Sequence, residues 1–494
     1  MQWTVAAVLI LYIYGVYWLL RRRWKLASLS RRHIRGPGAS ILWGNSRQLE
    51  KDPLTTLGNW IKKYGSYFGY YEGSHPVIVL TDVDTIQKLL HDPLFKSRPT
   101  DPDTESFASS VEVLHGVQWR NSRNAVIQCF DESRLIEVLP VVAEVSRTFT
   151  EMFMDYARLA RDANVSSLAD RFSLEVLART ALAIEADCLR SKTTIEEYAL
   201  GRPCNLLSLL RHVPFIRHLR GVLNYFTQYG RATADVVTHV RSVVELRHEG
   251  ELPPKEDLLQ FLLDAVEKPK DQCLVVANAL QFLSAFQAIG SCLTFLVHAL
   301  TDQPRLQEKL GQEVGSLPDE PSLADLNALP FLDAVFCETL RFFPPKPHFV
   351  TRECPRNYTL NGFFFPAGCS VLVPVFHVHR DPQLWVAPDE FCPERFTNSE
   401  SLSTMQPLRH PAQYLPFGLG PRSCIGSRFV ALVVKLAVVH LLREMRFRPG
   451  VGFQSPLKVT LRGKQGNLRP VDEVIVRPIP LNSFTSTFGQ YHIP

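Results

Sequence analysis

The chain opens with a long apolar segment, from Trp3 to Leu20 (WTVAAVLILYIYGVYWLL), that carries no charged residue. About 18–20 apolar residues are enough to cross the hydrocarbon core of a bilayer as a helix. Seven basic residues follow between Arg21 and Arg35, and the first acidic residue is Glu50. Because basic residues collect at the cytosolic end of such helices, we predict a transmembrane anchor over residues 1–20 with the rest of the chain in the cytosol.

A cleaved signal peptide is the alternative for this segment. The apolar run is longer than the apolar region of a signal peptide, no small-x-small cleavage site follows it, and the basic residues lie on the wrong side. We therefore expect the anchor to remain. A basic juxtamembrane region and proline hinge follow over residues 21–40, where Gly36-Pro37-Gly38 breaks any helix.

Composition excludes several classes of protein. With 494 residues, of which 46% are hydrophobic and 21% charged, the chain is too apolar and too balanced in charge to be disordered. Its net charge of +5 is smaller than the contribution of the seven basic residues beside the anchor. The charge therefore marks membrane topology and gives no reason to expect nucleic acid. The ten cysteines show no CxxC pair, which fits a reducing compartment rather than a disulfide framework.

Hydrophobic periodicity gives the organisation of the rest. A helical pattern dominates residues 117–300, and strand patterns occupy 67–71, 76–80 and 350–374. A further helix is predicted over 427–445, with strands in the last fifty residues. We therefore predict a mainly α fold with small sheets near both ends, and one large catalytic or binding domain over residues 41–494.

The most informative segment reads FGLGPRSCIG, from Phe417 to Gly426. Cys424 opens a strongly apolar helix, and the amides at the start of a helix stabilise a thiolate. The glycines before Arg422 allow the backbone to approach something flat and bulky, and Arg422 can neutralise an anion on the same ligand. Cys-Ile-Gly alone would indicate only a structural cysteine after a glycine turn.

The whole segment resembles the haem-thiolate signature FxxGxRxCxG of the cytochrome P450 family, with Phe417, Gly420, Arg422, Cys424 and Gly426 at its fixed positions. The resemblance implies the P450 fold, a helix-rich triangular domain with small β-sheets, and haem b as cofactor. It implies Cys424 as the axial ligand of the haem iron, and Phe417, Arg422 and Gly426 as cofactor-binding residues. Further motifs follow in the family's order along nearly the whole chain.

A second motif, Glu338-Thr339-Leu340-Arg341, resembles the family's ExxR pair. The i,i+3 spacing places Glu338 and Arg341 on one face of a helix. Taken alone they would form a surface ion pair, but the apolar context FLDAVFCETLRFFPP predicts burial, and a buried pair needs a further partner. The resemblance implies that Arg395, in PDEFCPERF, supplies it, so we expect a structural role for all three residues.

Two more segments resemble haem-propionate contacts of the family. Trp119 and Arg123 match its WxxxR helix, in which both side chains donate hydrogen bonds to a propionate. Without the family, they would be a half-buried Trp and an exposed Arg on one helix. His348, in PHFVTR, resembles the position in a strand from which a His also reaches a propionate.

The apolar segment from Leu274 to Leu300 aligns with the family's central helix over the haem, and its polar interruptions argue against a second membrane span. Most members carry (Ala/Gly)-Gly-x-(Asp/Glu)-Thr there, whereas this chain has Ser284-Ala285-Phe286-Gln287-Ala288. The acid becomes Gln287, which can hold water but cannot act as an acid, and the alcohol becomes Ala288. Ser284 is our candidate for the missing hydroxyl, so these three residues form the predicted catalytic set.

The resemblance implies a monooxygenase that inserts one oxygen atom from O2 into an apolar small molecule such as a lipid, sterol or xenobiotic. Two alternatives stay open because the acid and alcohol are absent. The first is a reductase-independent isomerase or dehydratase acting on a lipid peroxide, and the second is a haem protein that binds ligand without turnover. We expect the substrate cavity to draw walls from residues 98–116 and 200–225, from the central helix, from Phe349-Val350 and from the terminal strands.

The chain has no flavin or nicotinamide motif, so its electrons must come from a partner. Similarity to microsomal members implies a membrane NADPH–cytochrome reductase, with cytochrome b5 as a second candidate donor. It also implies a single-pass protein of the endoplasmic reticulum membrane with a cytosolic catalytic domain. A basic face of Arg120, Arg134, Arg428 and Lys435 is the expected docking surface for an acidic reductase.

Overall fold

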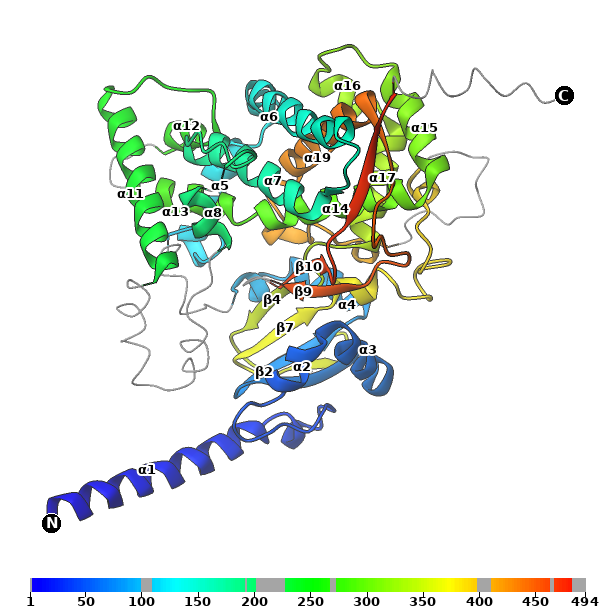
Figure 1. The fold of residues 1–494 in the computed structure, drawn as a ribbon. Coiled ribbons are helices and arrows are strands. Elements are labelled where there is room, and N and C mark those ends of the chain that lie inside the picture. The colour runs from blue at the N-terminus through cyan, green and yellow to red at the C-terminus, as the bar shows by residue number, and fades with distance from the viewer. Residues whose placement is uncertain are drawn as a thin grey trace. The chain divides into compact units, whose positions relative to one another are not determined.

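The computed structural model describes residues 2–98, 109–191, 193–200, 227–266, 272–397, 410–462 and 466–481. The chain divides into two compact units. The first comprises Met1–Pro99, His348–His379 and His410–Ser423, and the second comprises Thr100–Pro347, Arg380–Arg409 and Cys424–Pro494. Helices dominate, and the strands form small sheets (Figure 1), as the sequence predicts.

A four-stranded sheet forms the centre of the first unit. Its strands, in spatial order, are β1 (Tyr67–Glu72), β2 (His75–Leu80), β7 (Cys369–Val373) and β4 (Phe349–Cys354). β2 and β7 pair in parallel, and the other two pairs are antiparallel. A separate hairpin joins β5 (Tyr358–Leu360) to β6 (Phe363–Phe365). The strand patterns expected at 67–71 and 76–80 correspond to β1 and β2.

The described helices of the first unit are one long N-terminal helix and several short ones. They are α1 (Gln2–Leu26), η1 (Ser30–Arg32), α2 (Ser46–Lys51), α3 (Pro53–Tyr64), α4 (Val83–His91), η2 (Pro93–Lys96), α18 (Val375–Val378), η8 (Pro411–Gln413) and η9 (Gly420–Arg422). The apolar face of α3 packs Leu57 and Trp60 against Phe68 of β1. The carboxylate of Asp82 caps α4 by accepting a 2.9 Å hydrogen bond from the Thr85 amide.

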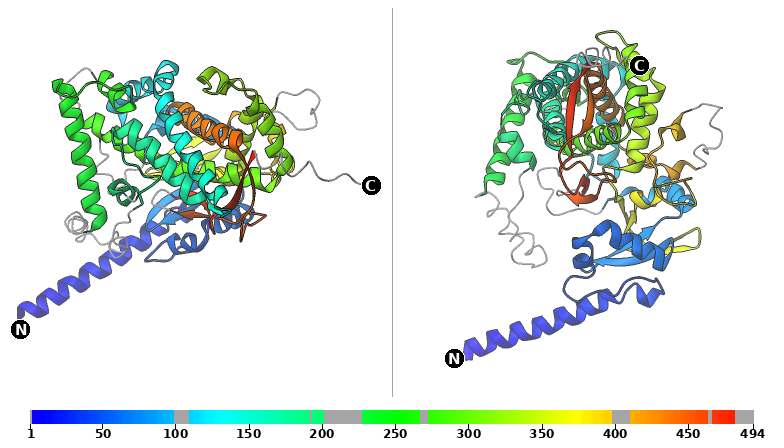
Figure 2. Two further views of the ribbon diagram at one scale, coloured as in Figure 1. Left: turned by 45° about the horizontal axis from the view of Figure 1, so that its top comes forward. Right: turned by 45° about the vertical axis from the view of Figure 1, so that its right-hand side comes forward.

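The second unit is a set of helices packed around α14 (Phe286–Asp302), which is buried along most of its length. Its other helices are α5 (Gly116–Gln128), α6 (Glu132–Arg158), α7 (Val165–Leu182), α8 (Thr194–Leu200), α11 (Gln228–Glu249), α12 (Leu258–Asp264), α13 (Gln272–Leu283), α15 (Pro304–Gly315), α16 (Leu323–Asn327), α17 (Pro330–Phe342), η6 (Pro393–Phe396) and α19 (Ser427–Glu444). α14 packs on α7, α17 and α19, whereas α11 lies at one edge beside α8 and α13 (Figure 2).

Two small sheets complete the second unit. β11 (Ile475–Pro480) pairs antiparallel with β3 (Ala163–Asn164) on one side and β8 (Met445–Pro449) on the other. A hairpin joins β9 (Val459–Arg462) to β10 (Asn467–Pro470), and β10 packs on α14. The sequence predicts strands in this region, but it does not predict the short strand β3, whose two residues show no alternating pattern.

The central segment differs from the single helix predicted from Leu274 to Leu300, because it is broken between α13 and α14. The amides of Ser284 and Ala285 donate to carbonyls three residues back, at 3.0 Å each, which closes a tighter turn than an α-helix. The Ser173 hydroxyl on α7 donates to the carbonyl of Phe286 at 2.9 Å. The break is therefore a turn in which bonds to carbonyls three residues back replace the helical ones, and the Ser173 bond holds the start of α14 against α7.

Among the described residues, one helical stretch, Gln272–Asp302, has the length and composition to cross a membrane. Inside the structure 67% of its apolar window is buried, as in the core helix of a globular domain. The described part of α1 does not qualify as a second such stretch, so the N-terminal transmembrane helix stays a prediction.

Candidate functional site

Cys424 lies in the loop that leads into α19. Gly418 and Gly420 in this loop have left-handed backbone angles, with φ of +75° and +76°. Gly426 is the N-cap of α19, and its carbonyl accepts the first helical hydrogen bond from the Val430 amide at 2.9 Å. The side chain of Cys424 is exposed three residues before the helix begins. The local geometry therefore presents a thiol at the N-terminal end of an 18-residue helix.

Within the first unit, the same loop packs closely on the end of α4. A Cβ atom added at Gly420 would lie 2.3 Å from the Leu90 carbonyl oxygen, so no larger residue fits without movement. Arg422 is 4% exposed, and its Nε donates to the carbonyl of Lys96 at 2.9 Å. Phe417 is half-buried in this unit. The glycine and arginine of the motif thus fix the loop against η2 and α4.

Three side chains that sequence reasoning grouped together meet in the second unit. The carboxylate of Glu338 accepts from Nε and Nη2 of Arg341 at 2.8 and 2.7 Å, and from Nε of Arg395 at 3.4 Å. The amide of Cys392 completes the set at 2.8 Å. Arg395 also donates to the carbonyl of Ala387 at 2.7 Å. The cluster ties α17 to the segment that contains η6.

Trp119 and Arg123 lie one turn apart on α5. Trp119 is 5% exposed, and the guanidinium of Arg123 lies 6.0 Å from its ring centre. The pair therefore shares one face of the helix, as the spacing predicts. His348 lies in the first unit, half-buried immediately before β4.

The three residues of the predicted catalytic set lie at the break of the central helix. The Ser284 hydroxyl donates to the carbonyl of Gln281 at 2.6 Å and accepts from the Gln281 side chain at 2.9 Å. The amide oxygen of Gln287 accepts from Nδ2 of Asn467 on β10 at 2.7 Å. Ala288 is half-buried in the first turn of α14.

Asn467 and a nearby ion pair were not found by sequence reasoning. Arg469 of β10 lies 2.7 Å from the carboxylate of Asp170 on α7. Burial raises the pKa of Asp170 to about 6, although Arg469 acts in the opposite direction. A Cβ at Gly290 would lie 2.3 Å from that carboxylate, so the glycine of α14 makes room for it. A short polar strand far along the chain gives no sequence signal for such contacts.

The basic docking face predicted from sequence is wrong at one of its four positions. Lys435 is 4% exposed and forms an ion pair with Asp333. Arg134 pairs with Glu137 at 3.0 Å, while Arg120 and Arg428 are exposed. Lys435 falls on the buried face of α19, where the aliphatic stem packs and the ammonium needs an acidic partner. Two of the predicted substrate walls, 98–116 and 200–225, fall largely on residues 99–108 and 201–226, which lie outside the described residues.

These residues fit a haem group by the chemistry of their donors. Cys424 offers a thiol that is exposed at a helix N-terminus, and two left-handed glycines keep side chains out of the preceding loop. Trp119, Arg123, His348 and Arg422 all carry N–H donors of the type that bind carboxylates. A flat, anionic cofactor with a metal open to thiolate ligation matches this set.

A model described as cytochrome P450 matches residues 34–466 of the chain. Similar curated proteins include cytochrome P450 3A28 of Bos taurus, 28% identical over 502 residues that cover 97% of this chain and 96% of that protein. Cytochrome P450 3A6 of Oryctolagus cuniculus is 28% identical over 85% of this chain and 86% of that protein. Cytochrome P450 3A29 of Sus scrofa is 26% identical over 98% and 97%.

Proposed function

The chain belongs to the cytochrome P450 family and is a haem-thiolate monooxygenase that uses haem b, and on this premise we propose that Cys424 is its thiolate ligand. The observation that carries this proposal is the exposed side chain of Cys424 in the loop before α19. The amides of the first turn of α19 stabilise the anionic sulfur. The motif from Phe417 to Gly426 surrounds this one cysteine and none of the others.

When bound, haem with a thiolate ligand supplies the activation of O2 from which one oxygen atom is inserted into substrate. Four side chains of this chain are proposed to hold its propionates through charge-assisted or neutral N–H donors: Trp119, Arg123, His348 and Arg422. Phe417 and Gly426 complete the cofactor-binding set. Glu338, Arg341 and Arg395 are proposed to stabilise the fold around the cofactor-binding loop.

Ser284, Gln287 and Ala288 are proposed to line the distal groove. Ser284 keeps a hydroxyl that can pass a proton to or from an ordered water, because its hydrogen donates and its oxygen accepts. Gln287 cannot give up a proton, so we assign it to holding water and to fixing β10 through Asn467. Ala288 leaves open the space that an alcohol side chain would fill, so water or a substrate hydroxyl completes the relay.

We infer that the substrate is an apolar small molecule, in the class of lipids, sterols and xenobiotics. The electron donor is proposed to be a membrane NADPH–cytochrome reductase, with cytochrome b5 as an additional donor. These inferences come from the family, because the names of the similar proteins specify neither substrate nor partner. Arg120 and Arg428 are exposed on the second unit and remain docking candidates, whereas the buried Lys435 does not.

The chain is proposed to sit in the endoplasmic reticulum membrane by a single anchor over residues 1–20, followed by the hinge over 21–40 and the catalytic domain over 41–494. Side chains along α1 support the anchor, because Trp3 is 88%, Leu9 59% and Leu20 64% exposed. Exposed large apolar side chains on a helix call for an apolar partner such as lipid.

Spectroscopy of the ferrous–CO complex tests the ligand. The wild type should show the red-shifted Soret band of thiolate ligation, and Cys424→Ser should lose it while the exposed Cys273→Ala keeps it. A red-shifted band in Cys424→Ser would refute the assignment. A screen of substrates by Soret shift, run with and without reductase and NADPH, tests the reaction. Turnover of a lipid peroxide without NADPH would replace the monooxygenase proposal with the isomerase alternative.

A further inference from the structure

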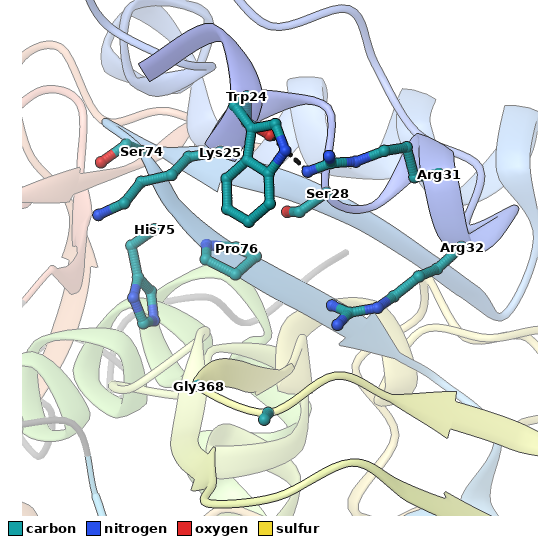
Figure 3. A pocket seen from close by; sticks show the side chains of 10 residues that line it. Trp24, Lys25, Ser28, Arg31, Arg32, Ser74, His75, Pro76 and Gly368 are labelled. Atoms are coloured by element: carbon teal, nitrogen blue, oxygen red, sulfur yellow. Dashed lines mark hydrogen bonds between the residues drawn. The ribbon is translucent and has the colours of Figure 1, made fainter. Parts of the chain in front are cut away.

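A basic cavity of about 490 Å³ lies in the first unit, where the C-terminal end of α1 meets the start of β2 and the turn before β7 (Figure 3). None of its ten lining residues is acidic. They are Trp24, Lys25, Ser28, Arg31, Arg32, Ser74, His75, Pro76, Ala367 and Gly368.

Three cations line this cavity, and none of them forms a salt bridge with a described residue. Nη2 of Arg31 donates to the Trp24 carbonyl at 2.7 Å, and its guanidinium lies 4.3 Å from the Trp24 ring centre. Arg32 and Lys25 have no acidic partner among the described residues. The guanidinium of Arg32 lies 5.9 Å from the centre of the Phe364 ring. The cavity therefore holds positive charge that no described acidic residue neutralises through a direct ion pair.

Neutral polar groups add hydrogen-bonding capacity. Figure 3 shows Ser74, His75 and Lys25 on one side of Trp24, with Arg31 and Arg32 on the other. Nε2 of His75 lies 2.7 Å from the Ser370 hydroxyl. Burial lowers the pKa of His75 and Lys25 lowers it further, against the carboxylates of Glu72 and Glu353. His75 is therefore neutral at pH 7 and contributes a polar ring rather than a fourth charge.

The segment that carries these cations is held against β1 of the four-stranded sheet. The Leu29 amide donates to the Tyr71 hydroxyl at 2.9 Å, and Leu29 is buried. The amide of Gly69 in β1 donates to the Arg35 carbonyl at 2.9 Å. A Cβ at Gly36 would lie 1.8 Å from the Gly69 carbonyl oxygen, so the chain here touches backbone to backbone. Such docking fixes the backbone that carries these cations before a ligand arrives, which reduces the entropy lost on binding.

We propose that this cavity binds the phosphate of an anionic phospholipid headgroup. The proposal rests on the membrane anchor in the proposed function, because α1 leads directly into Trp24 and Lys25 and would place the cavity at headgroup level. Arg side chains bind phosphate oxygens by paired N–H donors, and Lys adds a point charge. Three cations with no acid among the lining residues favour a net negative headgroup over a zwitterionic one.

Calorimetric titration of the full chain in neutral detergent tests the site. The probes are dihexanoyl phosphatidic acid below its micellar concentration, dihexanoyl phosphatidylcholine, and inorganic phosphate. We expect phosphatidic acid to bind best and the K25Q/R32Q variant to weaken it by about tenfold or more. The R21Q/R23Q variant removes two exposed basic residues outside the cavity and should stay within about twofold of the wild type.

Equal weakening by the two double variants would overturn the site. Phosphatidylcholine binding as tightly as phosphatidic acid would overturn its preference for an anionic headgroup, and inorganic phosphate binding as tightly would show that free phosphate is the ligand. Flotation of the wild type with phosphatidylcholine vesicles measures membrane association through the anchor in a separate experiment. Failure to float would reject the anchor without affecting the titration, and an unchanged ferrous–CO band would show that both variants keep the catalytic fold.

Discussion

Glu338 and Arg341, one turn apart on α17, form a fully buried ion pair in which Nη2 of the arginine lies 2.7 Å from Oε1 of the carboxylate. A buried pair is tolerated only when its remaining hydrogen-bonding groups also find partners. The carbonyls of Pro388 and Glu390 each accept from Arg341 at 2.9 Å. The pair therefore fastens α17 to the segment before η6.

Replacing Arg341 with leucine should destabilise the protein by about 3–5 kcal/mol, because the carboxylate of Glu338 stays buried with its main partner removed. Urea unfolding measures the loss, and the haem content of the purified protein should fall with it. Arg158→Gln breaks an exposed pair with Asp155 on α6 and should cost about 0.5 kcal/mol or less. Similar losses in the two variants would contradict a special role for the buried pair.

Gly420→Ala should be more harmful than an alanine at a glycine with the same backbone angle. Gly452 has φ of +78° with no atom within 4 Å of an added Cβ, so Gly452→Ala should cost only about 1 kcal/mol of backbone strain. At Gly420 the added Cβ would also meet the Leu90 carbonyl oxygen at 2.3 Å. We expect Gly420→Ala to lose at least a further 1–2 kcal/mol in urea unfolding, by order of magnitude. Equal costs would show that the loop can move away.

The sequence predicts the local elements and the position of the cysteine motif well. Helical and strand periodicity locate β1, β2 and α19 to within a few residues, because each places a regular apolar face on a core. The i,i+3 spacing and apolar context also predict that Glu338 and Arg341 share a buried face. Such features depend on neighbours along the chain, which a sequence displays directly.

Contacts between distant segments could not be predicted in the same way. The bond between Asn467 and Gln287 joins residues 180 positions apart, and no local pattern marks either partner. The hydrogen bond from the Ser173 hydroxyl of α7 to the Phe286 carbonyl at the start of α14 likewise joins distant segments. Lys435 was predicted on the exposed face of α19, but tertiary packing covers it and supplies Asp333. These outcomes are set by packing rather than by propensity.

His440 of α19 should make stability depend on pH. Burial, with repulsion from Arg147 and Arg443, lowers its pKa from 6.5 to about 4, while Glu320 acts in the opposite direction. A lowered pKa in the folded state means that the unfolded chain takes up the proton first. Stability from His440 is therefore present above pH 6.5 and is lost as the pH falls towards 4.

Urea unfolding at several pH values measures this contribution. Because the ring is only partly buried, we expect a loss of roughly 1–2 kcal/mol across the window. His440→Leu should remove that part of the slope, whereas the exposed His248→Leu should retain it. The same slope in wild type and His440→Leu would mean that another group titrates.

Ser284→Ala should uncouple NADPH consumption from product formation. The hydroxyl of Ser284 is the candidate proton-relay group at the break before α14, and alanine removes it without adding bulk. We expect product formed per NADPH to fall by about tenfold, with more peroxide released; this is less than the roughly 100-fold or larger loss typical of a positioned proton-transfer group, because ordered water takes over part of the relay. Ser291→Ala is the matched control. The Ser291 hydroxyl lies in α14, is fully buried and donates to the Gln287 carbonyl at 2.7 Å. Coupling that is unchanged in Ser284→Ala, or lowered equally in both variants, would remove Ser284 from the relay and leave ordered water or substrate to carry the proton.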